Sequence, residues 1–348
     1  LIMVAFKGNQ ISKFAPNSLP KKIEWLILTD NNLHELPEDF GNYTQLKKLA
    51  LAGNKLKHLP PSMANCTNLE LVRLSANNLT KLDDWLLELP KLAWLAFAGN
   101  NFNKAQCLTK STLKNTPLEN FQLKKVIGQG ASGVIHLAKA ERNNVAVKLF
   151  KGAITSDGYP LDEVNCCLQA ANHANLIKVL SYIEQSEQLG LVMELIDSNY
   201  TNLGLPPSLE TCTRDTFNDG CNYSIEAVYK IAKQMANTLT HLHTNKVSHG
   251  DIYAHNTMIN EHYDVLFGDF GAATNLVMLS EYQQQQIQLI EVRAFGCLIE
   301  DLLSTVSAAD KQNDLFDKMS DIAARATNSV IASRPSFKAL NVLLNELV

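Results

Sequence analysis

The chain lacks long apolar runs and an excess of charge of either sign, and each absence excludes a class of protein. Its longest apolar run covers residues 189–196 and contains Glu194, so it is too short to span a bilayer. The net charge of −4 gives no electrostatic footprint for nucleic acid or for an anionic membrane surface. The 348 residues, 46% hydrophobic and 19% charged, suffice for about two or three globular domains. We therefore expect a globular protein with no nucleic-acid partner and no membrane span.

The cysteines also lack a pattern. There are seven of them, an odd number, and no spacing between them repeats. This favours free thiols in a reducing compartment over disulfides. Three triplets that start at Asn42, Asn65 and Asn78 match the glycosylation sequon and argue the other way. Such triplets arise often by chance, so we retain the reducing compartment.

The first hundred residues repeat with a period of 23. The pattern L-x-x-L-x-L-x-x-N-x-L-x-x-L-P places asparagines at Asn31, Asn54, Asn77 and Asn100, and a partial copy precedes the first. This is the signature of leucine-rich repeats, in which each repeat buries its leucines by stacking on its neighbours. Amphipathic helices fit poorly, because each Leu-Pro would interrupt them. We predict a solenoid over residues 1–104. Because the chain starts at Leu1 within the pattern, we expect a fragment of a longer protein.

The residues between the inward leucines predict the role of the solenoid. On the concave face they include Trp25, Leu71 and Trp94. Large apolar side chains on an open face indicate a protein contact, with a separate partner or with the chain's own second domain. The alternative is that these aromatics only cover neighbouring strands. A polar cap and linker then follows at 105–119, so both domains share one compartment.

The second half contains polar residues at intervals that suit phosphoryl transfer. Gly128, Gly130 and Gly133 form a glycine-rich turn between predicted strands 121–127 and 134–139, and Lys148 lies in the next predicted strand. Further on come Asp251 in His-Gly-Asp, Asn256 five residues later, and Asp269 in Asp-Phe-Gly. Taken alone, each of these elements can be explained without a function, as a turn or as a residue exposed to solvent. Two carboxylates and a carboxamide at this spacing can orient a hydroxyl and bind magnesium.

Together and in this order, these motifs resemble the protein kinase family over residues 120–348. The resemblance implies a two-domain α/β protein in which the solenoid precedes a bilobal fold, with a β-rich N-lobe and an α-rich C-lobe. It also implies ATP and Mg²⁺ as cofactors, and a protein substrate. The need for ATP favours a cytoplasmic location.

The resemblance assigns a role to each matching residue. Lys148 would hold the α- and β-phosphates and pair with Glu163 on a predicted helix over 161–172, with Asp162 as second choice. Asp251 would accept or orient the hydroxyl proton. Asn256 and Asp269 would bind Mg²⁺. The predicted nucleotide-binding residues are Gly128, Gly130, Gly133, Val134, Ala146, Lys148, the gatekeeper Met193, and the hinge Glu194, Leu195 and Ile196.

The sequence departs from the family in the loop around Asp251. Gly250 replaces the arginine that normally pairs with a phosphorylated activation loop, which argues against that mode of control. Tyr253 and His255 occupy positions where the family places a cation. The segment after Gly271 is also short.

The sequence on either side of these loops also predicts one residue pairing and one helix. Ser280-Glu281 resembles a shortened form of the family's A-P-E motif, and we expect Glu281 to pair with Arg334. A helix over 223–243 is predicted before the catalytic loop.

The leading hypothesis is an ATP-dependent protein kinase directed at serine and threonine, whose leucine-rich repeats bind a substrate or regulator on their concave face. The edits around Asp251 leave two alternatives. One is a nucleotide-binding pseudokinase scaffold, and the other is a kinase-fold enzyme that phosphorylates a small molecule.

Overall fold

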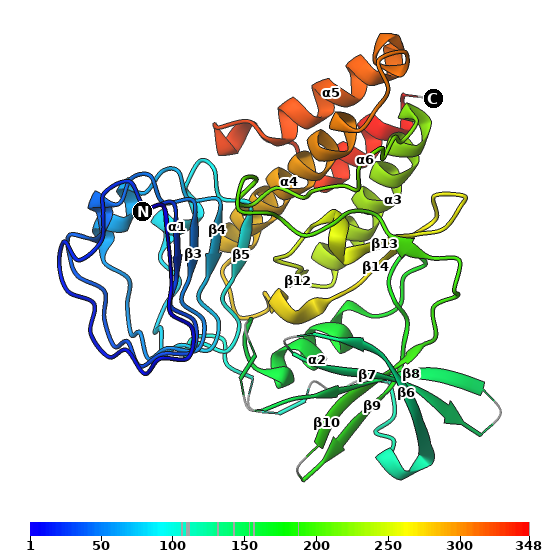
Figure 1. Cartoon of the computed structure of the whole chain (residues 1–348), viewed down its shortest axis with the longest axis horizontal. Coiled ribbons are helices and arrows are strands. Elements are labelled where there is room, and N and C mark those ends of the chain that lie inside the picture. The colour runs from blue at the N-terminus through cyan, green and yellow to red at the C-terminus, as the bar shows by residue number, and fades with distance from the viewer. Residues whose placement is uncertain are drawn as a thin grey trace.

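The computed structural model describes residues 1–347 except 106, 109–111, 131, 142, 153, 156 and 187. Four of these residues, 106 and 109–111, fall inside the linker predicted at 105–119, so that part of the prediction lies outside the described residues. Figure 1 shows three parts: a set of stacked coils on the left, helices at the upper right, and a twisted sheet below them. None of the helices in the described part of the chain has the length and hydropathy needed to cross a membrane.

The stacked coils each contribute one strand to a parallel sheet in the order β1-β2-β3-β4-β5. The strands are β1 (Met3–Ala5), β2 (Trp25–Ile27), β3 (Lys48–Ala50), β4 (Leu71–Arg73) and β5 (Trp94–Ala96). From β2 onward each residue pairs with the one 23 positions later, as Lys48 pairs with Leu71. The 23-residue period is therefore the register of the sheet. We call these coils the repeat array.

The asparagine column stabilises the array as the sequence predicts. Asn54 donates from Nδ2 to the carbonyl oxygens of Leu28 (2.8 Å) and Leu51 (3.0 Å), and its Oδ1 accepts from the N–H of Leu33 (3.0 Å). Asn77 repeats this pattern one coil later. Each carboxamide thus satisfies backbone groups that would otherwise be buried without partners. The outer side of the coils carries η1 (Phe40–Asn42), η2 (Pro61–Asn65) and α1 (Asp84–Leu87).

The twisted sheet is antiparallel, in the order β6-β7-β8-β10-β9. Its strands are β6 (Phe121–Gln129), β7 (Gly133–Ala140), β8 (Asn143–Phe150), β9 (Val179–Gln185) and β10 (Gln188–Glu194). The helix α2 (Pro160–Ala170) follows β8, with Pro160 in its first turn, where the missing N–H costs nothing. The strands predicted around the glycine turn and the helix predicted near Glu163 are present.

The remaining residues form a mainly helical part. Its helices are α3 (Ile225–Thr244), α4 (Glu281–Ser304), α5 (Asp314–Ala326) and α6 (Phe337–Asn345). Short strands and turns lie between them: β11 (Thr201–Asn202), β12 (Val247–Ser248), β13 (Thr257–Ile259), β14 (Val265–Phe267), β15 (Thr274–Asn275), η4 (Ala254–Asn256), η5 (Phe270–Ala272), η6 (Asp310–Gln312) and η7 (Ile331–Ser333), while η3 (Leu118–Asn120) precedes β6. The helix predicted at 223–243 corresponds to α3.

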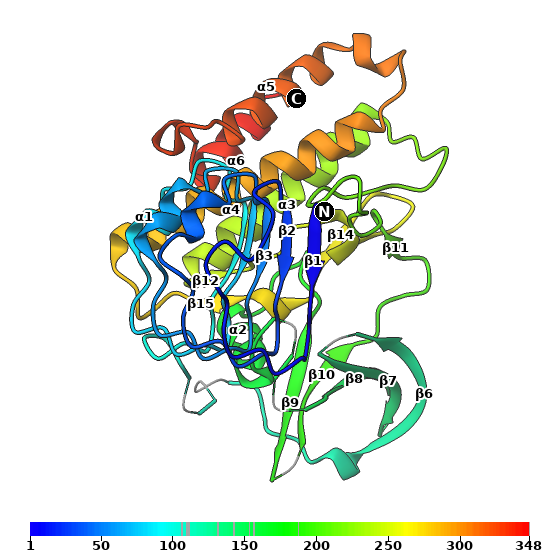
Figure 2. The same ribbon diagram turned by 60° about the vertical axis from the view of Figure 1, so that its left-hand side comes forward.

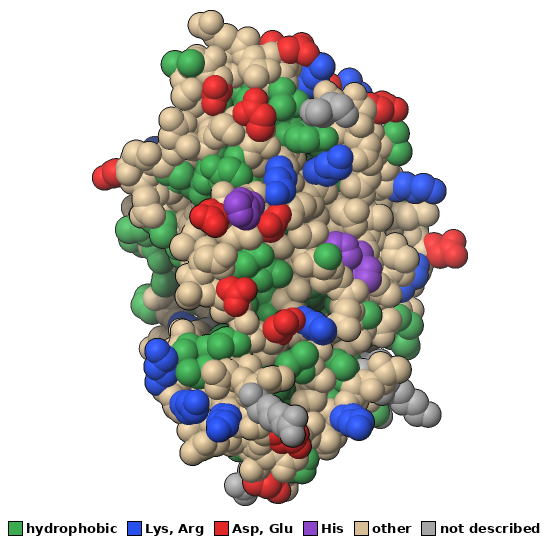
Figure 3. Space-filling model, turned by 90° about the vertical axis from the view of Figure 1, so that its right-hand side faces the viewer, with side chains coloured by type: hydrophobic (Ala, Val, Ile, Leu, Met, Phe, Trp, Pro, Cys, Tyr) green, Lys and Arg blue, Asp and Glu red, His purple; other side chains and the backbone are tan. Residues whose placement is uncertain are grey.

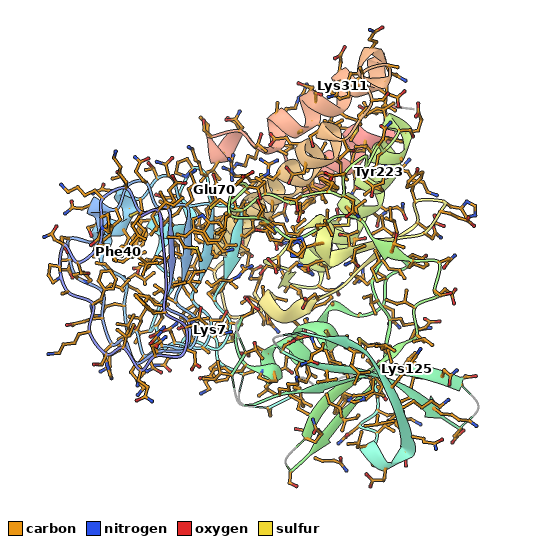
Figure 4. The ribbon with its side chains drawn as sticks, viewed as in Figure 1. Lys7, Phe40, Glu70, Lys125, Tyr223 and Lys311 are labelled. Carbon is orange, nitrogen blue, oxygen red and sulfur yellow. The ribbon has the colours of Figure 1, made fainter. Side chains whose placement is uncertain are left out.

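The repeat array packs directly against the helical part. Leu276, Leu279, Ile287 and Ile290 are buried in the same apolar cluster as the leucines of the repeats. Both β5 and α1 contact α4; β5 lies beside the helical part in Figure 1, and α1 lies near α4 in Figure 2. Figure 4 marks Glu70 at this junction, where its carboxylate accepts a hydrogen bond from the Thr213 hydroxyl. The concave face around β4 and β5 is therefore covered by the chain itself.

One predicted pairing at the end of the helical part is wrong. Arg334 donates to the carbonyl oxygens of Asn328 (2.8 Å), Leu289 (3.0 Å) and Pro90 (2.6 Å), and not to Glu281. Glu281 instead lies in the first turn of α4, which begins directly after the short segment that follows Gly271. Arg334 therefore ties the helical part to the repeat array.

Trp94 is the main aromatic contact between the two parts. Its ring stacks on Tyr253 with centroids 4.7 Å apart and planes 4° apart, and its Nε1 donates to the carbonyl oxygen of Ile252 (3.0 Å). The side chain is 1% exposed. The apolar signal that Trp94 contributes to the concave face thus belongs to an intramolecular contact.

Trp94→Phe should lower the free energy of unfolding by about 1–3 kcal/mol, because the Ile252 carbonyl would lose its donor in a buried site. Urea-induced unfolding measures the change. Trp85→Phe, at a half-buried tryptophan in α1, is the matched control and should cost less. Equal losses in the two variants would contradict a specific role for the Trp94 hydrogen bond.

Candidate active site

A cleft of about 530 Å³ is lined by residues of the twisted sheet, α2 and the loops that precede α4. The predicted site residues in its lining are Gly130, Gly133, Ala146, Lys148, Glu163, Met193, Glu194, Leu195, Ile196, Asn256 and Asp269. Gly128, Val134 and Asp251 lie outside the lining. Gly128 and Val134 are on the paired strands β6 and β7 that frame it. The structure therefore brings most of the predicted residues to one cleft.

Lys148 and Glu163 form an ion pair inside the cleft. The Lys148 ammonium donates to Oε1 of Glu163, and both side chains are buried. Lys148 lies on β8, and Glu163 lies in the first turn of α2. Asp162, the second choice, is also buried, but it lies next to Gly99 of the repeat array and is not part of the cleft lining. The two residues that the sequence pairs are thus in contact, and their part in a reaction stays a prediction.

Burial controls the electrostatics of this pair. It raises the pKa of the Glu163 carboxyl to about 6, although Lys148 opposes that shift. Burial also opposes the charge of Lys148, but attraction to Glu163 and Asp269 outweighs it and raises the pKa of the lysine. The pair is therefore charged near neutral pH and loses its negative partner under mild acid.

The three oxygen-bearing residues of the loops lie close to one another. Asn256 donates from Nδ2 to the carbonyl oxygen of Asp251 (3.0 Å) and to its Oδ2 (3.3 Å). Asp269 has a left-handed backbone (φ +60°), and its Oδ1 accepts from the N–H of Gly271 (3.3 Å). His249 Nε2 lies 2.9 Å from the carbonyl oxygen of Gly268, which joins the two loops. Asn256 and Asp269 both line the cleft, and their side chains carry oxygen atoms of the kind that Mg²⁺ prefers.

Sequence reasoning missed one charged residue of this site. Arg73, at the end of β4 in the repeat array, donates from Nη1 to the carbonyl oxygen of Gly250 (3.0 Å) and from Nη2 to Oδ1 of Asp251. A signal was available, because the concave-face column that contains Arg73 otherwise holds Ile27, Ala50 and Ala96. A lone arginine in an apolar column indicates a buried acidic partner.

Comparison with known proteins agrees with this geometry. The family model of the protein kinase domain matches residues 121–289, and that of the leucine-rich repeat matches residues 44–102. The chain therefore contains a protein kinase domain preceded by leucine-rich repeats. The matched region includes the cleft and the first part of α4, whereas α5 and α6 lie beyond it.

Two relatives show how far the similarity extends. The serine/threonine-protein kinase PITSLRE of Drosophila melanogaster is 26% identical over 235 residues, which are 58% of this chain and 23% of that protein. The CTD kinase subunit alpha of Schizosaccharomyces pombe is 23% identical over 201 residues, 51% of this chain and 32% of that protein. The chain thus spans less than a third of the length of these relatives.

Proposed function

We propose that the chain is an ATP-dependent protein kinase directed at serine and threonine hydroxyls. One observation carries this proposal: the Lys148–Glu163 ion pair is formed in the same cleft that Asn256 and Asp269 line. Kinase catalysis requires this ion pair and the metal-binding aspartate to be in place together. The name of the fly relative, a serine/threonine-protein kinase, supports the choice of acceptor.

The residues present fit a magnesium–nucleotide complex. The cleft volume of about 530 Å³ lies within the usual range for small-molecule sites. Mg-ATP would supply the phosphoryl group that is transferred. Asn256 and Asp269 would hold the metal, and Lys148 would hold the phosphates. The glycine-rich turn from Gly128 to Gly133, with Val134, Ala146, Met193 and the hinge 194–196, would enclose the nucleotide.

Asp251 would act on the acceptor. It lies beside Asn256 and next to the cleft, where it can orient the substrate hydroxyl and take its proton. With Mg-ATP bound, the hydroxyl oxygen would form its bond to the γ-phosphorus while the bond from that phosphorus to the ADP oxygen would break. The proton resides on Oδ2 or passes to solvent, so atoms and charge balance.

We further propose a division of labour along the chain. Residues 1–104 would form a solenoid, 105–119 a cap and linker, and 120–348 a bilobal kinase domain that works in the cytoplasm. A separate protein partner would bind the concave face near β1 and β2, where Ala5 is exposed and Ile27 half-buried, because β4 and β5 are covered. Figure 3 shows the side of the molecule that lies away from the repeat array, and acidic and basic side chains are mixed over most of it, so this side has no basic footprint for nucleic acid.

The proposed function is tested by incubating the chain with Mg-ATP and a generic protein substrate, followed by mapping of phosphosites by mass spectrometry. We expect phosphoserine and phosphothreonine with the wild type, and transfer that is much slower but still measurable with Asp251→Asn. If no phosphate is incorporated beyond the level of the variant, the proposal is wrong. Thermal stabilisation by ATP without transfer would then indicate a pseudokinase scaffold, and turnover on a metabolite panel would indicate a small-molecule kinase.

The phosphate-transfer rate should fall about tenfold for each pH unit below about pH 6. Burial raises the pKa of Glu163 to about 6, so a falling pH adds a proton to it and releases Lys148. The Glu163→Gln variant should transfer phosphate slowly, and its rate should not fall further below about pH 6 (the acid limb of the pH profile). Burial also raises the pKa of Asp162 to about 6, and Asp162→Asn should keep the limb because Asp162 is outside the cleft. Rates measured between about pH 5 and pH 8 test this prediction. If the rate of Glu163→Gln still fell at low pH, the group that titrates would not be Glu163.

A further inference from the structure

Arg73 connects the repeat array to the proposed catalytic aspartate. Its guanidinium contacts three groups: the Gly250 carbonyl oxygen (Nη1, 3.0 Å), Oδ1 of Asp251 (Nη2) and Oδ1 of Asp157 (Nε, 3.4 Å). The Arg73 side chain is 8% exposed. An arginine remains protonated in such a site, so the array places a permanent positive charge against Asp251.

The catalytic loop itself offers no such charge. Tyr253, two residues after Asp251, is buried under Trp94 of the array. His255 lines the cleft, but its Nδ1 lies 2.7 Å from Oδ1 of Asp215 and so pairs with a different carboxylate. The positions from which a loop residue could reach Asp251 are thus used to dock the array and to bind another acid. Of the array's cations, Lys48 is also near, but its ammonium lies over the Trp25 ring, 4.7 Å from the centroid.

Gly250 makes the approach of the array possible. Its φ is +73°, and a Cβ at this position would lie 2.9 Å from the carbonyl oxygen of Leu95 on β5 and 2.6 Å from that of Ala272. Both neighbours are backbone atoms, which cannot move aside as a flexible side chain can. A side chain at residue 250 would therefore separate the loop from the array. The close approach of β5 to Gly250 leaves no room for a side chain at residue 250, and the same approach brings Arg73 into contact with the loop.

We propose that Arg73 is a positioning residue of the active site, through which the repeat array provides in cis the cation that the catalytic loop lacks. This inference rests on the proposed kinase activity. Arg73 binds both the backbone and the carboxylate of the loop, so it fixes the direction of the Asp251 side chain. Asn256 reaches the other carboxylate oxygen, at 3.3 Å. A planar guanidinium is suited to this, because it offers several donors in a rigid fork.

The exposures favour positioning over obstruction. The Asp251 side chain is 21% exposed, whereas that of Arg73 is 8% exposed. Solvent, and therefore a hydroxyl, reaches the aspartate from a side that Arg73 does not cover. Arg73 is also absent from the lining of the nucleotide cleft, so its removal should leave nucleotide binding intact.

The test compares Arg73→Met, Arg73→Lys and Arg73→Ala in the full chain. We expect Arg73→Met to lower kcat about 100-fold, the effect of a small misplacement of a catalytic group, with KM for ATP unchanged. Arg73→Lys should retain part of the rate, and millimolar guanidinium should partly restore Arg73→Ala. Lys81→Met, at an exposed array cation paired with Asp83, is the control and should leave kcat unchanged.

Double variants separate positioning from a general structural role. In the Asp251→Asn background, Arg73→Met should cause no further loss, because Arg73 acts through that carboxylate. Thermal unfolding with ATP identifies variants that fail to fold, and Arg73→Lys replaces Arg73→Met in the comparison if the latter does. An unchanged or faster kcat in a folded Arg73 variant, or losses that multiply in the double variant, would overturn the inference. Absence of transfer by the wild type overturns the proposed function as well, so the two failures are distinguishable.

Discussion

The Asp269→Asn variant should fold normally and transfer phosphate about 10³-fold more slowly than the wild type, because it removes one charge from the cleft. Asparagine tolerates the left-handed backbone of residue 269, and its side-chain oxygen can still accept the hydrogen bond from Gly271. A neutral carboxamide binds Mg²⁺ more weakly than a carboxylate, so the phosphates would be held with less positive charge around them.

Initial rates at saturating Mg-ATP measure this effect. The matched control is Asp264→Asn, which removes a half-exposed carboxylate that pairs with Lys230 (2.8 Å) on the loop between β13 and β14. It should change the rate less than about twofold, because exposed ion pairs contribute little to stability. If Asp269→Asn kept more than about a tenth of the wild-type rate, Asp269 would not be the essential metal ligand.

Gly250→Ala should lower the free energy of unfolding by about 3–5 kcal/mol. Two costs combine at this position. The backbone is left-handed, and the new methyl would meet the carbonyl oxygens of Leu95 and Ala272 at less than 3 Å. Relief requires a movement of the array away from the catalytic loop, so activity should fall together with stability.

Gly220→Ala separates the two costs. Gly220 has a similar φ of +78°, but a Cβ there would meet no atom within 4 Å. We expect this control to lose only about 1 kcal/mol, the cost of the left-handed backbone. Urea midpoints of the two variants give the difference, which measures the contact between loop and array. Equal losses would show that the close approach at Gly250 has no energetic weight.

The features that could be predicted from sequence are those encoded locally. The 23-residue period predicts the register of β2 to β5, because each repeat reproduces the same contacts with its neighbours. The predicted partners Lys148 and Glu163 are only 15 residues apart and meet in the cleft. Lys148 lies in a segment whose sequence predicts a strand, and Glu163 lies in a segment whose sequence predicts a helix.

The features that could not be predicted depend on docking between distant surfaces. Arg73 and Asp251 are 178 residues apart, and no local pattern links them. The predicted pairing of Arg334 with Glu281 failed for the same reason, since Arg334 binds the Pro90 carbonyl of the array. Gly250 was recognised as a departure from the family, but its cause lies in the backbone of Leu95, which only the assembled structure reveals.

Leu276, Leu279, Ile287 and Ile290 of the kinase part are buried among the repeat leucines, so the kinase part completes the apolar core of the array. A stack of repeats needs such a neighbour, since its last coil would otherwise expose its core to water. We therefore expect that neither half folds stably without the other. Cutting the chain in the linker would expose apolar surface on both pieces if they separated. Heating the intact chain should unfold the array and the helices in a single calorimetric transition.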